Sequence, residues 1–117
     1  MTLAEIVSML QETTIPFAYR AFEADGNAPA PPFICYFFPN NIPEAADDAN
    51  AVQIEELDIE LYTKYKDFEL EASIEAILTS HDLTFSRDET WLDDEQMQMT
   101  LYTMEVVIDG EQDPVRT

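Results

Sequence analysis

Residues 60–71 have the sequence Glu-Leu-Tyr-Thr-Lys-Tyr-Lys-Asp-Phe-Glu-Leu-Glu, and an alternating pattern of apolar residues changes to a helical one within this stretch. Before it, apolar residues at 57, 59 and 61 alternate with polar ones, which is the period of a strand with one solvated face. After it, apolar residues at 70, 74, 77 and 78 have helical spacing. The stretch therefore predicts a strand over Val52–Tyr62, a short turn, and a helix that Asp67 caps and that ends near Ser80. Three glutamates are expected mainly outside the apolar stripe of this helix: Glu69, Glu71 and Glu75.

Similar patterns predict the remaining elements. Thr2 and Glu5 form a capping box, which predicts a helix from Leu3 to about Thr13, before Pro16. The other predicted strands are Phe17–Phe22, Phe33–Phe38, Thr84–Thr90 and Met97–Ile108. The chain is therefore expected to be an α+β protein in the order α-β-β-β-α-β-β, with a mostly antiparallel sheet of about five strands and two helices packed on one face. We expect a single domain over residues 1–109 and a flexible C-terminal tail over residues 110–117.

Three finer features of the sheet can also be predicted. Phe33–Phe38 contains no polar break, which is typical of a strand covered on both faces, either central in the sheet or closed over by a neighbouring subunit. Apolar residues at 52 and 54 have the opposite phase to the rest of their strand, so we expect a bulge or bend near Glu55-Glu56. Asn40–Asn50 is expected to be a loop, and Trp91–Glu95 is expected to connect the last two strands.

The charge of the chain limits its partners. The 117 residues include 25 acidic and 5 basic ones, for a net charge of −20, so a direct nucleic-acid footprint or an anionic membrane surface is disfavoured. The apolar fraction of 46% is too high for an intrinsically disordered chain. A single cysteine and the lack of a signal-peptide pattern lead us to expect a reducing cytoplasm. The acidic surface is expected to provide solubility, to meet a basic protein, or to imitate a nucleic acid.

Candidate chemistry is sparse. His81 is the only histidine and follows a helix end, where a surface or capping role is favoured over a triad with a serine or with Cys35. Asp47-Asp48 and Asp93–Glu95 could offer oxygen ligands to a divalent cation, but neither has the spacing of a calcium loop, so solvated loops are favoured. We therefore expect no catalytic, metal or cofactor-binding residues and no enzymatic activity.

Four residues are predicted to form interfaces between subunits. Lys64 and Lys66 are two of the five basic residues and flank Tyr65; they either pair locally with Glu60, Glu69 or Glu71 or contact a neighbouring copy. Arg20 is proposed because basic residues are scarce, and Trp91 because an exposed tryptophan is a common interface anchor.

The same residues carry a resemblance to a known family. Leu57–Asp67, followed by Phe68–Glu71 and Ile74–Leu78, resembles the small tail proteins of long-tailed bacteriophages and of prophages in Gram-positive hosts. Glu89–Leu92 and the strand around Met99–Val106 also look like that family, as does the first helix with the Pro-Phe-Ala-Tyr sequence that follows it. The resemblance implies an α+β tail terminator or tail completion protein without a cofactor. Such proteins form a six-membered ring on the finished tail tube, stop its polymerisation and contribute to joining the tail to the head.

This resemblance leads to an expected function. We expect a structural protein of the virion tail, present in the bacterial cytoplasm during assembly, whose partners are copies of itself, the tail tube protein and head–tail connector proteins. An acidic ring wall would let DNA slide past without adhesion. The alternative is an acidic DNA mimic that inhibits a nucleic-acid-binding protein, and a small hydrolase that uses carboxylates is a third, weaker class.

Overall fold

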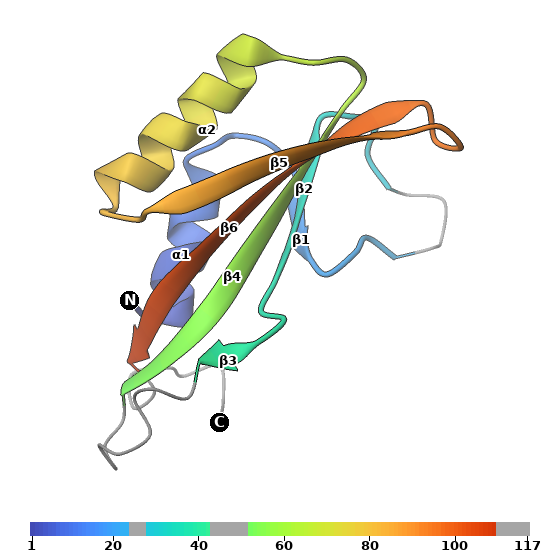
Figure 1. The fold of residues 1–117 in the computed structure, drawn as a ribbon. Helices are drawn as coiled ribbons and strands as arrows, with labels where there is room; N and C mark the ends of the chain where they lie inside the picture. Colours follow the sequence, from blue (N-terminus) through green and yellow to red (C-terminus); the bar gives the residue numbers. More distant parts are fainter. Residues whose placement is uncertain (24–27, 43–51, 110–117) are drawn as a thin grey trace.

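The computed structural model describes residues 1–23, 28–42 and 52–109 of the chain. It has two helices and a six-stranded, mostly antiparallel sheet, so the α+β class is confirmed, with one strand more than predicted. The elements are α1 (Leu3–Gln11), β1 (Phe17–Tyr19), β2 (Phe33–Phe37), β3 (Asn41–Ile42), β4 (Val52–Thr63), α2 (Phe68–Ser80), β5 (Phe85–Leu92) and β6 (Met97–Asp109) (Figure 1). The predicted tail at 110–117 lies outside the described residues.

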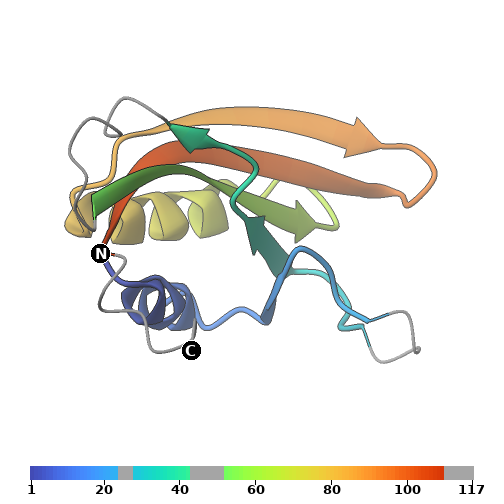
Figure 2. The same ribbon diagram turned by 90° about the horizontal axis from the view of Figure 1, so that it is seen from below.

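The sheet has the strand order β1-β2-β4-β6-β5, and β3 pairs with the beginning of β4. The pairings are antiparallel except that of β1 with β2, which is parallel. Both helices lie on the same side of the sheet, and no helix of the described residues lies on the other side (Figure 2). We call these the covered face and the open face.

Strand alternation decides which residues fill the core. On β4, Leu57, Ile59 and Leu61 point to the covered face, where they pack with alternate residues of β6 and with both helices. The buried apolar side chains that form this core are Ile6, Met9, Leu10, Ile15, Ile34, Leu57, Ile59, Leu61, Ile74, Leu78, Tyr102, Met104, Val106 and Ile108.

The helices begin where the sequence predicts. The Thr2 hydroxyl accepts a hydrogen bond from the Glu5 amide at 3.1 Å, and the Glu5 carboxylate accepts one from the Thr2 amide at 2.7 Å, which completes the capping box. At α2, the Asp67 carboxylate accepts a hydrogen bond from the Leu70 amide at 3.0 Å. Both helix starts are therefore fixed by side chains within three residues of the ends they cap.

Three strand predictions are corrected by the sheet. The first predicted strand ends at Tyr19, because Arg20 has a positive φ of 67° and turns the chain away. Phe33–Phe37 is second from the edge, and the central strand is β4, so the central placement is wrong, whereas cover by a neighbouring subunit stays a prediction. The predicted loop from residue 40 contains the short strand β3, whose Ile42 pairs with Ile54; the rest of that loop, residues 43–50, lies outside the described residues.

The predicted bulge near Glu55-Glu56 is wrong. The β4–β6 ladder runs without interruption from Val52 opposite Asp109 to Thr63 opposite Gln98. The two apolar phases of β4 belong to its two faces, because Ile54 points to the open face beside Val107 and Ile42.

The final hairpin is longer than predicted and extends beyond its neighbours. Trp91 and Leu92 belong to β5, and the ladder continues until Leu92 pairs with Met97. Because β4 ends opposite Gln98, the segment Trp91–Gln98 has no third strand beside it beyond its first pair, Trp91 with Gln98, and Figure 2 shows it projecting from one end of the sheet. We call this segment the arm.

Candidate functional site

Lys66 is held between two carboxylates, one buried and one exposed. Its ammonium nitrogen lies 2.8 Å from a Glu71 oxygen on α2 and 2.6 Å from a Glu89 oxygen on β5. The hydrogen bond to Glu71, followed by the one to Glu89, raises the pKa of Lys66. Local ion pairing, one of the two readings of this lysine, is therefore observed, with Glu71 as expected and Glu89 as a partner that the sequence did not suggest. An intersubunit role for Lys66 stays a prediction.

Glu71 is only 1% exposed, so its predicted position outside the apolar stripe is wrong. Its second oxygen accepts hydrogen bonds from the Thr100 hydroxyl at 3.1 Å and from the Gln98 amide at 3.4 Å. These partners compensate the buried charge, which is why a glutamate can lie on the core side of α2. The spacing of Glu71 from Ile74 and Leu78 is that of one helix face, so the signal was present in the sequence, although the charge argued against it.

Glu75 and Arg87 extend this buried network to the edge of the sheet. The Arg87 guanidinium donates to Glu75 at 2.7 Å, and the Tyr102 hydroxyl donates to the same carboxylate oxygen at 2.9 Å. Desolvation, together with the hydrogen bond to Glu75, raises the pKa of Tyr102. The network fastens α2 to β5 and β6, so its chemistry is structural.

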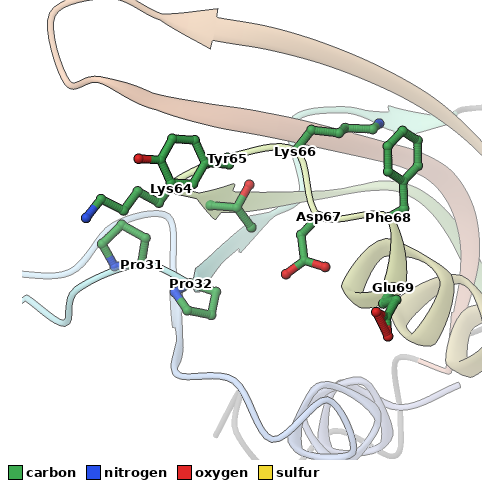
Figure 3. Close-up of a pocket in the computed structure, with 9 residues that line it drawn as sticks. Pro31, Pro32, Lys64, Tyr65, Lys66, Asp67, Phe68 and Glu69 are labelled. Atoms are coloured by element: carbon green, nitrogen blue, oxygen red, sulfur yellow. The ribbon is translucent and has the colours of Figure 1, made fainter.

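The turn between β4 and α2 forms a pocket with Pro31 and Pro32 of about 480 Å³ (Figure 3). In Figure 3, the Lys66 side chain extends toward Phe68, whose ring centre lies 5.0 Å from the ammonium, whereas Lys64 and Tyr65 lie on the proline side. Tyr65 is 71% exposed and Phe68 is 74% exposed, and Lys64 has no ion pair to a described residue. This corner therefore presents two aromatic rings and a cation to solvent.

Arg20 lies at the β1 edge of the sheet. Its amide donates to the Tyr36 carbonyl at 2.7 Å, and its guanidinium lies 5.9 Å from the Tyr19 ring centre and 5.8 Å from that of Phe37. No ion pair joins Arg20 to a described residue. The guanidinium is therefore positioned by aromatic rings and is open to an acidic partner.

An apolar groove lies beside Arg20, between α1 and the β1–β2 edge, with a volume of about 290 Å³. Its walls are Leu3, Ala4 and Val7 from α1, and Tyr19, Tyr36 and Phe38 from the strands. The Tyr19 and Tyr36 rings meet edge to face with centres 5.2 Å apart, so the aromatic wall is packed in place. The sequence does not indicate this groove, because the parallel contact of β1 with β2 joins segments that are separated by a long connection.

The open face carries a buried carboxylate, Asp58, whose charge is only partly compensated. Asp58 is 8% exposed, and one of its oxygens has no hydrogen-bond partner among the described residues. Burial, hydrogen bonding with Glu56 and the charges of Glu56 and Glu60 raise the pKa of Asp58 to about 6, while hydrogen bonding with Thr103 opposes the shift. Glu55, the fourth acid of this strand, points to the other face and accepts a hydrogen bond from Asn41 at 2.9 Å.

The residues considered for catalysis are occupied in other ways. His81 is the C-cap of α2, and its Nε2 atom lies 2.9 Å from a carboxylate oxygen of Glu12, so it links the ends of the two helices. Cys35 is buried on the open face, and desolvation raises the pKa of its thiol. Within the described parts of the chain, no three His, Cys, Asp or Glu side chains are grouped in a way that could hold a metal ion.

Comparison with known proteins assigns no family to this chain, since no family model matches it and no curated protein matches it significantly. Over the described ranges, neither helix is long and apolar enough to cross a membrane. The arguments about function therefore rest on the chain's own residues.

Proposed function

We propose that this chain is a structural subunit of a phage or prophage tail, which terminates the tail tube or joins the tail to the head as a six-membered ring. The observation that carries the proposal is the placement of large aromatic side chains on the surface at opposite edges of one sheet. Tyr19 lies at the β1 edge, Trp91 lies in the arm at the β5 edge, and Tyr65 and Phe68 lie at the adjoining corner. Aromatic side chains are enriched at protein interfaces.

The sequence resemblance supplies the particular assembly. The stretch that resembles the tail proteins, Leu57–Asp67 with the following helix, forms the central strand, the aromatic corner and α2. These elements place the corner next to the arm, because Lys66 bonds to Glu89 two residues before Trp91. A chain with these contacts at its two edges is suited to meeting neighbours on both sides.

The strong negative charge fits a ring through which DNA passes. Five carboxylates point to the open face by strand alternation: Glu56, Asp58, Glu60, Asp88 and Glu105. A wall of this sign lowers adhesion of the phosphate backbone. We propose that the open face contributes to the lumen, and a ring whose lumen is neutral or basic would contradict that placement.

The proposal is tested by sizing and imaging the purified chain. Light scattering should give about six times the 13.4 kDa chain mass, and negative-stain images should show rings at the ends of tail tubes and shorter tubes when the protein is present during polymerisation. A chain that remains a monomer with tubes present, and that leaves their length unchanged, would exclude the tail role.

The open face also favours the second candidate, an acidic DNA mimic. Its carboxylates at alternate positions of β4 form a row about 7 Å apart, as strand geometry requires. A mimic would bind a basic nucleic-acid-binding protein as a monomer or dimer, and salt would weaken the complex. The burial of Asp58 counts against this reading, because a mimic must present its charges to solvent.

A further inference from the structure

The arm and the groove are complementary surfaces at opposite edges of the sheet. The arm belongs to β5 and β6 at one end of the strand order, and the groove belongs to β1, β2 and α1 at the other. Figure 2 shows the arm at one end of the molecule and α1 toward the other. Neither surface can therefore meet its complement within the same chain.

Their apolar parts match in kind and in size. Trp91 is 47% exposed although it is the largest side chain of the arm, because β4 and α2 do not reach beyond it. The groove is lined by aliphatic and aromatic side chains, and its volume of about 290 Å³ is close to the lower limit of ordinary ligand pockets, about 300 Å³. A single indole ring is an occupant of suitable size and polarity.

Their charged parts match as well. The turn of the arm carries Asp93, Asp94 and Glu95, all exposed. Arg20 lies at the same sheet edge as the groove, with its guanidinium 5.9 Å from the centre of the Tyr19 ring, which forms one wall, and 5.8 Å from that of Phe37. The chain has only five basic residues, and one of them, Arg20, lies near the groove. The acidic turn follows Trp91 on the arm.

We propose that the arm of one copy docks into the groove of the next, with Trp91 between α1 and the Tyr19–Tyr36 wall and the acidic turn against Arg20. This inference rests on the proposed ring and names the contact that builds it. The contact is heterologous, because each copy gives its arm to one neighbour and receives an arm from another. Repetition of one such contact closes a ring without any two-fold axis.

Two variants disable the two sides separately. Trp91→Ser removes the anchor, and Ala4→Glu fills the groove with a like charge while keeping α1, since an acidic residue is favourable in the first helical turn. The matched controls are Val107→Ser, which removes an apolar side chain of similar exposure (46%) from the open face, and Ala72→Glu, which makes the same change at an exposed position of α2. Each disabling variant should raise the subunit dissociation constant by at least about 30-fold, and the controls should raise it less than about 3-fold.

Mixing the two disabled variants gives the decisive measurement. The intact groove of Trp91→Ser accepts the intact arm of Ala4→Glu, so an equimolar mixture should give heterodimers of twice the chain mass and no rings. A mixture that remains monomeric, or one that restores full rings, would overturn the head-to-tail contact. Circular dichroism and thermal midpoints equal to those of the wild type show that both variants are folded.

Charge reversal tests the second half of the contact. Arg20→Glu should weaken assembly, and Asp93→Lys with Asp94→Lys in the same chain should restore it. If the wild type forms rings and the Trp91→Ser, Ala4→Glu and Arg20→Glu variants form them equally well, this inference is rejected and the proposed tail function is not. A wild-type chain that stays monomeric at all concentrations would reject both.

Discussion

Glu71 and Asp58 are two buried carboxylates on opposite sides of the same sheet, and their surroundings differ sharply. Glu71, on the covered side, is bonded to the Lys66 ammonium and to the Thr100 hydroxyl. Asp58, on the open face, lies near the charges of Glu56 and Glu60, and one of its oxygens has no hydrogen-bond partner in the part of the chain that the structure describes. The fold therefore compensates one buried charge fully and the other only partly.

The two buried carboxylates therefore contribute differently to the stability of the fold. Desolvation of a charge is costly unless cations and hydrogen bonds replace the lost water, so the network around Glu71 contributes to holding the chain together. Asp58 contributes nothing of that kind while it is charged.

The largest effect is expected from Glu71→Ala. It leaves the buried Thr100 hydroxyl without its acceptor, removes one of the two acceptors of the Gln98 amide and removes a partner of Lys66, so the free energy of unfolding should fall by about 3 kcal/mol. Urea unfolding at a concentration below that of subunit association measures it. The matched control is Glu69→Ala, an exposed glutamate in the same helical turn, which should change the stability by less than about 0.5 kcal/mol. Equal losses in the two variants would mean that the buried network has no special weight.

Asp58→Asn should have the opposite sign. Burial raises the folded-state pKa of Asp58 to about 6 from the ordinary 3.8, so the protonated form favours folding. The stability that this group supplies is complete below pH 3.8 and is lost as the pH rises through 6. Asparagine cannot ionise, so the variant should be more stable than the wild type by on the order of 2 kcal/mol at pH 7.5 and equal to it near pH 3.5.

Two other acids on the open face must be taken into account in this measurement. The pKa of Glu56 is lowered, first by a hydrogen bond from Asn40 and then by one from Asp58, so Glu56 also makes stability depend on pH. The effect of Asp58 is therefore the difference in stability between the variant and the wild type. Asp88→Asn removes an exposed carboxylate from the same face and subtracts the general benefit of reducing a charge of −20. A stability difference that does not vary with pH would contradict the assigned environment of Asp58.

The sequence was sufficient where local signals decide the structure. The capping box at Thr2 and Glu5, the Asp67 cap and the alternation of Leu57, Ile59 and Leu61 each involve residues only a few positions apart. These signals gave both helices, the central strand and the α+β class. The length of the last hairpin was underestimated, because Trp91 and Leu92 are followed by a run of acids that resembles a loop.

The site could be predicted only in part, because its contacts are distant in sequence. Glu71 is buried by partners that lie 27 and 29 residues away, Gln98 and Thr100, which helical spacing alone cannot supply. Asp58 is buried on the open face beside Phe37 and Thr103, its register partners on β2 and β6, which strand alternation alone does not indicate. Arg20 and Trp91 were chosen for scarcity and exposure, and their role at an interface stays a prediction.

The smallest effect is expected from Arg87→Gln, and it limits how far the compensation of Glu71 extends. Arg87 is nearly half exposed; it bonds to Glu75 at 2.7 Å but lies 3.7 Å from Glu71. Because water screens the pair with Glu75 and Tyr102 still donates to that carboxylate, the loss of stability should be smaller than in the other variants and should shrink in high salt. A double-mutant cycle of Arg87→Gln with Glu71→Gln should give less coupling than the cycle of Lys66→Met with Glu71→Gln. Stronger coupling to Arg87 would mean that Arg87 on β5, and not Lys66 in the turn before α2, is the main cation that compensates Glu71.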